Sequence, residues 1–211
     1  MKHLLIIGAR GFGREVYSIA CESIGYGESF DIKGFLDDKA DALKGRDGYP
    51  PIIGSVEDYI VEKDDVFICA LGDVNYKKRY ASIILQKNGE FISLIHKTVT
   101  IGNNSTFGKG CIFSRYASIS CDIKIGDFVT ISTKAGLGHD VSIGNWCHVG
   151  GLTNISGFVN IGNNVTIHPG SNITPHRNIG SHSTIGVGSV VISNVKEGTT
   201  VFGNPARRMM F

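Results

Sequence analysis

The sequence lacks several features that would place it in a special class of protein. Its 211 residues include five cysteines, an odd number, and no two of them form a CxxC pair. Thiols in this pattern are typical of reduced cysteines rather than of disulfides or zinc ligands. The net charge is only +2, so the composition gives no sign of a nucleic-acid partner.

A long apolar segment is also missing from the start of the chain. Residues 1–7 are mostly apolar, but this run is too short for the core of a signal peptide or for a membrane span of about 20 residues. We interpret it as a first β-strand. We therefore expect a cytoplasmic protein without a membrane partner.

The dominant feature that is present is a repeat of six residues. From position 95 to position 191 every sixth residue is bulky and apolar, without an insertion. With about 45% apolar residues in an average chain, chance would fill these positions roughly once in a million times. The series is Ile95, Ile101, Phe107, Phe113, Ile119, Ile125, Ile131, Leu137, Ile143, Val149, Ile155, Ile161, Ile167, Ile173, Ile179, Ile185 and Val191. A period of six fits neither a helix nor a single strand, so it indicates a repeated supersecondary unit.

The other positions of this hexad are ordered as well. The residue after the bulky one is usually Gly or Ser, which we interpret as a bend that needs unusual backbone angles. The residue two positions before it is mostly small, and both should point inward. Short strands joined by bends, with three hexads in a coil, predict a parallel β-helix of about five coils. Arg177 interrupts the small inward series, so we expect a local distortion there.

The residues before the repeat follow a different pattern. We expect strands at residues 3–9, 31–36, 66–71 and 91–95, a Gly-rich turn at 10–13, and helices at 14–24 and about 75–87. Strands that alternate with helices indicate a small parallel α/β domain. We predict two domains, residues 1–93 and residues 94–211.

A glycine-rich turn in the first domain lies where a strand gives way to a helix. It reads Gly8-Ala9-Arg10-Gly11-Phe12-Gly13, and backbone amides at such a turn favour a phosphate. Its GxxGxG spacing differs from the GxGxxG of dinucleotide sites and counts against NAD. Asp37 and Asp38 close the second strand, where carboxylates can accept from ribose or base groups. Together these features favour a nucleotide site, with two ordinary turns as the alternative.

The sharpest chemical feature of the repeat is Gly138-His139-Asp140. Imidazole groups titrate near neutral pH, so a histidine can take a proton from an attacking amine or hydroxyl, and a neighbouring carboxylate can orient it. A plain surface histidine is the alternative. His148 lies half a coil further on, so the two histidines can meet only across an interface with another subunit. We interpret the remaining histidines of this region as surface residues: His96, His168, His176 and His182.

Six segments, in order and spread over nearly the whole chain, carry a resemblance to a known family. They are GARGFGREV, FLDD, CALGDVNYKKR, LIHKTVTIG, GLGHDVSIGNWCHVGG and GNPARRM. The combination resembles the bacterial nucleotide-sugar acetyltransferases, which include enzymes for UDP-4-amino-sugars and sialic acid O-acetyltransferases. The resemblance implies a small Rossmann-like domain followed by a left-handed parallel β-helix. It also implies a homotrimer with acetyl-CoA in the groove between neighbouring β-helices.

The resemblance assigns roles to individual residues. It implies that His139 is the general base, that Asp140 is its carboxylate partner and that His148 contacts acetyl-CoA. Further acetyl-CoA contacts would fall at Gly157, Pro169, Gly186 and Val187, and nucleotide contacts at Arg10, Gly11, Phe12, Asp37, Asp38 and Gly72. The implied reaction is N-acetylation of a nucleotide-linked amino-sugar, with a UDP-4-amino-sugar as first candidate, for surface glycan synthesis. O-acetylation of a sialic acid or another sugar hydroxyl is the alternative.

Two residues depart from the pattern of the family, and two other classes of function are alternatives. Phe12 stands where many family members have histidine, and Asp73 where they have asparagine, which leaves the nucleotide open between UDP, GDP and CMP. A zinc enzyme would need three imidazoles, and His139, His176 and His182 are poorly spaced for whole coils. We expect no metal. A non-catalytic scaffold is the other alternative, and the His-Asp pair and the nucleotide-type domain argue against it.

Overall fold

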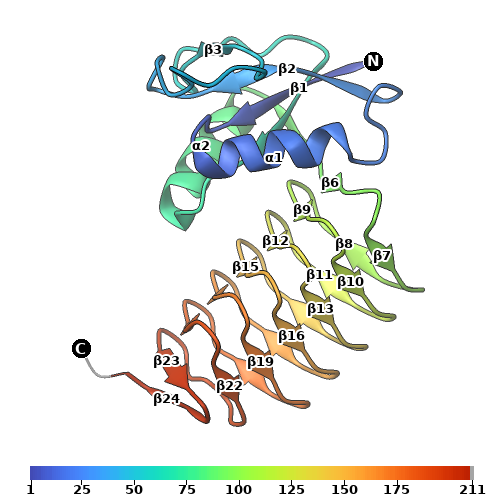
Figure 1. Cartoon of the computed structure of the whole chain (residues 1–211), viewed down its shortest axis with the longest axis vertical. Coiled ribbons are helices and arrows are strands. Elements are labelled where there is room, and N and C mark those ends of the chain that lie inside the picture. Colours follow the sequence, from blue (N-terminus) through green and yellow to red (C-terminus); the bar gives the residue numbers. More distant parts are fainter. Residues whose placement is uncertain (210–211) are drawn as a thin grey trace. The chain divides into compact units, whose positions relative to one another are not determined.

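The computed structural model describes residues 1–209. They belong to two compact units, Met1–Lys97 and Thr98–Phe211 (Figure 1). Residues 210 and 211, which end the second domain as placed from the sequence, lie outside the described residues. None of the described helices is long and apolar enough to cross a membrane.

The first unit contains a parallel sheet and two helices. Its elements are β1 (Lys2–Ile7), α1 (Gly11–Cys21), β2 (Phe30–Leu36), β3 (Ile52–Gly54), β4 (Asp65–Cys69), α2 (Val74–Gln86), β5 (Glu90–Phe91) and β6 (Leu94–Ile95). The strand order is β3-β2-β1-β4-β5 with all pairs parallel. The apolar runs of β1 and β4 are buried because they lie in the middle of the sheet. The predicted α/β domain is therefore confirmed.

This strand order places a ligand site. Strand β2 pairs with one edge of β1, and β4 pairs with its other edge. In open parallel sheets a crevice forms outside the carboxyl ends of the strands where the strand order reverses in this way, and ligands bind in that crevice. The glycine turn after β1, the aspartates after β2 and the residues after β4 all lie at that edge.

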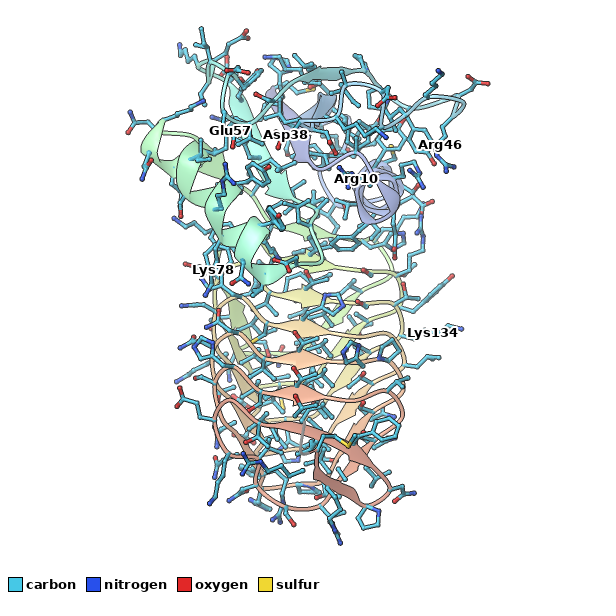
Figure 2. The ribbon with its side chains drawn as sticks, turned by 90° about the vertical axis from the view of Figure 1, so that its left-hand side faces the viewer. Arg10, Asp38, Arg46, Glu57, Lys78 and Lys134 are labelled. Carbon is cyan, nitrogen blue, oxygen red and sulfur yellow. The ribbon has the colours of Figure 1, made fainter. Side chains whose placement is uncertain are left out.

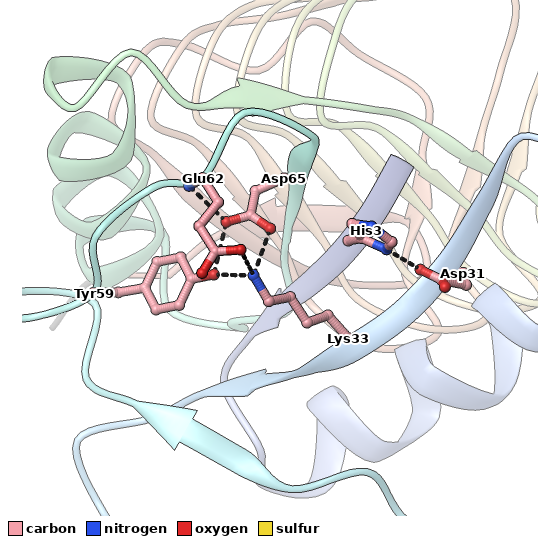
Figure 3. A network of polar contacts seen from close by, with 6 residues as sticks. All are labelled: His3, Asp31, Lys33, Tyr59, Glu62 and Asp65. Carbon is pink, nitrogen blue, oxygen red and sulfur yellow. Dashed lines mark hydrogen bonds and ion pairs between the residues drawn. The ribbon is translucent and has the colours of Figure 1, made fainter. Parts of the chain in front are cut away.

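A polar network joins β2 to the segment that precedes and starts β4 (Figure 3). Nζ of Lys33 donates to Oδ1 of Asp65 at 2.8 Å, to Oε2 of Glu62 at 2.8 Å and to the hydroxyl of Tyr59 at 2.7 Å. The Tyr59 hydroxyl donates to Oδ2 of Asp65 at 2.6 Å. Burial by itself would raise the pKa of Asp65, but these hydrogen bonds outweigh it, so the pKa lies below its usual value.

The second unit is a parallel β-helix of short strands. From residues 100–101 to residues 172–173 each strand pairs with the strand 18 residues further on, as Thr130 pairs with His148, so three hexads make one coil, as predicted. Figure 1 shows these coils stacked one on another.

Three sheets form the sides of this prism. The first contains β7 (Thr100–Ile101), β10 (Ser118–Ile119), β13 (Gly136–Leu137), β16 (Asn154–Ile155), β19 (Asn172–Ile173) and β22 (Val190–Val191). The second contains β8 (Thr106–Phe107), β11 (Lys124–Ile125), β14 (Ser142–Ile143), β17 (Asn160–Ile161) and β20 (Asn178–Ile179). The strands of the second unit that belong to the third sheet are β9 (Ile112–Phe113), β12 (Thr130–Ile131), β15 (His148–Val149), β18 (Thr166–Ile167), β21 (Thr184–Ile185), β23 (Thr200–Gly203) and the antiparallel β24 (Ala206–Arg208).

The bulky residue of each hexad fills the interior. From Phe113 to Val191 all members of the series are buried, whereas Ile101 and Phe107 are 38% exposed because β7 and β8 are the end strands of their sheets. Each buried aliphatic side chain stabilises the fold by about 1.5–3 kcal/mol relative to an exposed one. The distortion expected at Arg177 is absent. Its carbonyl accepts from the Asn160 N–H at 2.9 Å, and the ladder stays in register.

The interpretation of the residue after the bulky one is wrong in one respect. The left-handed backbone occurs two residues after this Gly or Ser position, with φ between 57° and 72° at each such residue. These corner positions are Asn104, Gly110, Tyr116, Asp122, Phe128, Lys134, Asp140, Trp146, Leu152, Phe158, Asn164, Gly170, His176, His182 and Gly188. The glycine directly after the bulky residue serves close stacking instead. A Cβ on Gly138, for example, would lie 2.6 Å from the backbone nitrogen of Gly157 in the next coil.

Candidate functional site

A pocket of about 460 Å³ lies at the carboxyl ends of β1, β2 and β4. Five of the six predicted nucleotide contacts line it: Arg10, Phe12, Asp37, Asp38 and Gly72 (Figure 2 labels Arg10 and Asp38). Gly11 is not among its lining residues. The structure thus brings together side chains from three separate turns.

The glycine turn is shaped for close backbone approach. Gly8 has φ +98°, and a Cβ on Gly13 would lie 1.8 Å from the carbonyl oxygen of Gly8. Helix α1 therefore starts directly against the end of β1. Arg10 at its N-cap makes no side-chain cap hydrogen bond, and no acidic residue lies in the first turn. The first N–H groups of a helix have no acceptor within the helix, and beside an arginine such a terminus can receive a phosphate.

Asp37 fastens this turn to the end of β2. Its Oδ2 accepts from the backbone N–H of Ala9 at 2.9 Å, and its Oδ1 accepts from the N–H of Lys39 at 2.9 Å. Both carboxylate oxygens are thus already hydrogen-bonded to backbone. Asp37 therefore shapes the site whether or not it also meets a ligand.

Asp38 has a partner that the sequence reasoning missed. The hydroxyl of Tyr80 on α2 donates to Oδ2 of Asp38. This hydrogen bond, with burial as the next cause, raises the pKa of Tyr80 to about 12. Tyr76 lies one turn earlier with its ring centroid 6.4 Å from that of Tyr80, and both line the pocket. Their spacing of four on a helix that follows β4 is the signal that could have placed them on one face.

The departure at Asp73 has a local explanation. Asp73 caps α2, and its Oδ1 accepts from the N–H groups of Asn75 at 2.8 Å and Tyr76 at 3.0 Å. Asparagine and aspartate are about equally good at this position of a helix. The exchange is therefore explained by capping.

The His-Asp pair lies at a corner between β13 and β14. Nδ1 of His139 is 2.8 Å from Oδ2 of Asp140, and the two side chains are 53% and 43% exposed. This contact leaves Nε2 as the nitrogen that can meet a substrate. The backbone of Gly157 lies against the imidazole, since a Cβ there would be 2.8 Å from Cε1 of His139. The pair is thus held in place and open to solvent, as a proton acceptor requires.

His148 points outward from a different side of the same prism. It lies on β15 in the third sheet, paired with Thr130 and Thr166, whereas His139 lies between the first and second sheets. The prediction that the two histidines lie on different sides of one chain is confirmed.

The other predicted acetyl-CoA contacts divide between two corners. Pro169 and Val187 occupy equivalent positions in successive coils at the end of the third sheet, and Gly186 precedes Val187. Val187 is 59% exposed, while Gly186 is covered by Phe202, whose ring carbon would be 2.3 Å from an added Cβ. Gly157 lies at the corner of His139 instead.

The remaining histidines and cysteines do not form a further centre. Among residues 1–209, no group of three or more His, Cys, Asp or Glu side chains is arranged to hold a metal ion. The interpretation of His96 as a surface residue is wrong, because it is 1% exposed and its Nε2 lies 2.5 Å from Oε2 of Glu22. None of the five cysteines forms a disulfide.

Comparison with known proteins identifies relatives of both units. Residues 3–84 match the family model of the PglD N-terminal domain. No curated protein sequence matches the chain. Among solved structures, the acetyltransferase domain of PglB from Neisseria gonorrhoeae is similar with a TM-score of 0.89 and 26% identity, over 99% of this chain and 100% of that chain. That domain has also been solved in complex with acetyl coenzyme A.

Two further structures have the same fold over their full length. PerB from Caulobacter crescentus, in complex with CoA and GDP-perosamine, gives a TM-score of 0.88 at 23% identity, over 100% of this chain and 98% of that chain. WeeI from Acinetobacter baumannii gives 0.86 at 24% identity, over 99% and 100%. The fold class is therefore confirmed: an α/β domain followed by a parallel β-helix, as in sugar acetyltransferases.

Proposed function

We propose that the protein transfers an acetyl group from acetyl-CoA to the amino group of a nucleotide-linked sugar. The observation that carries this proposal is the 2.8 Å contact between His139 and Asp140 on an exposed corner of the β-helix. The likeness to a PglB domain solved with acetyl coenzyme A, and to PerB with CoA and GDP-perosamine, supports it. Residues 1–93 would bind the nucleotide-sugar and residues 94–211 would carry the acetyl transfer, in a cytoplasmic enzyme of surface glycan synthesis.

The geometry of the pair supports direct attack by the amine. The sugar nitrogen forms a bond to the thioester carbonyl carbon, and the C–S bond to CoA breaks. Nε2 of His139 takes the proton that the nitrogen loses and can return it to the leaving thiolate. Asp140 holds Nδ1 and stabilises the imidazolium. A backbone N–H near the thioester would stabilise the oxyanion.

His139 and His148 lie on different sides of one β-helix, which supports a site shared between subunits. We keep His148, Gly157, Pro169, Gly186 and Val187 as acetyl-CoA contacts, provided in part by a neighbouring β-helix. A homotrimer closes such an arrangement, because each flat side meets its neighbour around one axis. Light scattering tests this assembly, and an active monomer of 22.7 kDa would contradict it.

The pocket of the first unit supports a nucleoside diphosphate as the part of the substrate that the first unit binds, with a UDP-4-amino-sugar as first candidate. Asp37→Ala should weaken binding of the nucleotide-sugar far more than binding of acetyl-CoA, because Asp37 shapes the glycine turn. Titration calorimetry separates the two ligands. Equal losses for both would contradict the assignment.

The catalytic assignment is tested by release of CoA over UDP-, GDP- and CMP-linked amino and hydroxy sugars. On the best substrate, His139→Ala should lower kcat by roughly 10²- to 10⁴-fold with little change in acetyl-CoA affinity. His182→Ala is a matched control, since His182 is exposed at another corner and contacts Asn164 at 3.3 Å. Near-normal turnover by His139→Ala would refute the mechanism. Better turnover of hydroxy than of amino sugars would favour O-acetylation.

A further inference from the structure

We propose that Phe158 is a positioning residue that fixes the imidazole of His139. The inference rests on the proposed role of His139 as the base. It is carried by three aromatic side chains at one corner of the β-helix, those of His139, Phe158 and His176, of which the proposed mechanism uses only His139.

Phe158 follows Asp140 by one coil at the same corner. Its ring centroid lies 5.0 Å from that of His139, with an angle of 87° between the two planes. The same phenyl ring stacks flat on His176, with the centroids 4.8 Å apart and an angle of 5° between the planes. The ring therefore contacts both imidazoles, perpendicular to the first and parallel to the second.

The fold itself does not require an aromatic residue here. Phe158 is a corner position with φ 60°, a conformation that asparagine tolerates better than phenylalanine. Asn104 and Asn164 already occupy corner positions. Phe158 is also 44% exposed, so burial in the core does not account for it. We assign the contact with His139 as the role of this ring.

Three neighbours together define the orientation of the His139 ring. Asp140 holds Nδ1 at 2.8 Å, which still permits rotation about that contact. The backbone of Gly157 covers one side of the imidazole, and the perpendicular phenyl ring of Phe158 limits the remaining rotation. Perpendicular aromatic pairs place the positive edge of one ring against the negative face of the other. Because the imidazole becomes positively charged only as it takes the proton, such a contact should act on kcat more than on KM.

The kinetic test replaces the ring without straining the corner. Phe158→Asn should lower kcat by about 2- to 12-fold, which corresponds to the worth of one aromatic pair. The KM for acetyl-CoA should stay the same, and Phe158→Tyr, which keeps the ring, should restore kcat. Leu152→Asn is the matched control, since Leu152 is a corner residue that is 63% exposed.

A spectroscopic test makes the outcome independent of activity. In the free protein, NMR signals of the His139 imidazole, assigned with His139→Ala, should shift in Phe158→Asn, because the nearby ring current is lost. They should stay in place in Leu152→Asn. Unchanged signals in Phe158→Asn, with or without a loss of kcat, would overturn the inference. If His139→Ala remained active while the signals did shift, the proposed function would fail and the contact would stand.

Discussion

Replacing Gly157 with alanine should displace the imidazole of His139 and slow acetyl transfer. The added Cβ would lie 2.8 Å from Cε1 and 2.9 Å from Nε2 of His139, whereas ordinary contacts begin at 3.4 Å. The imidazole would therefore have to move by about 0.6 Å. A displacement of about 1 Å at a reacting group can cost about 100-fold in rate, so we expect kcat to fall by roughly 10-fold. The fold should survive, because the atoms that must move belong to the end of a flexible side chain.

The assay is CoA release at saturating acetyl-CoA, with thermal unfolding measured alongside. Gly136→Ala is the matched control. Gly136 lies in β13 of the neighbouring stretch, and a Cβ there would meet only Oδ1 of Asn154, at 3.2 Å. It should retain wild-type kcat. Wild-type kcat in Gly157→Ala would show that the imidazole does not need its observed position, and the reasoning would be refuted.

Three further perturbations test other parts of the molecule. Lys33→Met should lower the free energy of unfolding by roughly 3 kcal/mol in urea at neutral pH, because Asp65 is left buried without its cation. Since the folded pKa of Asp65 is lowered, its stabilisation exists above the unfolded value of about 3.9 and is lost as the pH falls through the folded value. The difference between variant and wild type should therefore shrink in acid, and a constant difference would contradict this. Tyr80→Phe should weaken nucleotide-sugar binding by about 2- to 12-fold in calorimetry, because Asp38 loses its hydrogen bond. His148→Ala should raise the KM for acetyl-CoA with kcat nearly unchanged, and a loss confined to kcat would argue against a cofactor contact.

Repetition explains why so much of the fold can be predicted from the sequence. In the β-helix each bulky residue packs against the equivalent residues of the coils above and below, as Ile131 does with Phe113 and Val149. The period in the sequence therefore also specifies which residues contact one another in the fold. Alternation of strands and helices serves the first unit in a similar way, because the carboxyl ends of parallel strands meet at one edge.

Other expectations failed because they depend on backbone geometry or on a single long-range contact. The period located the bends, but not the residue in each bend that adopts the left-handed backbone. The interpretation of His96 as a surface residue fails because its partner Glu22 is 74 residues away in the sequence. The pair of Tyr80 and Asp38 spans 42 residues, so it too depends on a long-range contact that local spacing does not predict.

The sequence by itself determined the coil, its inward series and the adjacent His139 and Asp140, because these follow from spacing within one or two hexads. Only the tertiary structure decided that Gly157 and Phe158 lie against the imidazole of His139. Those contacts arise where one coil lies on the next, and the identity of the side chains that meet there is set by stacking rather than by any local preference.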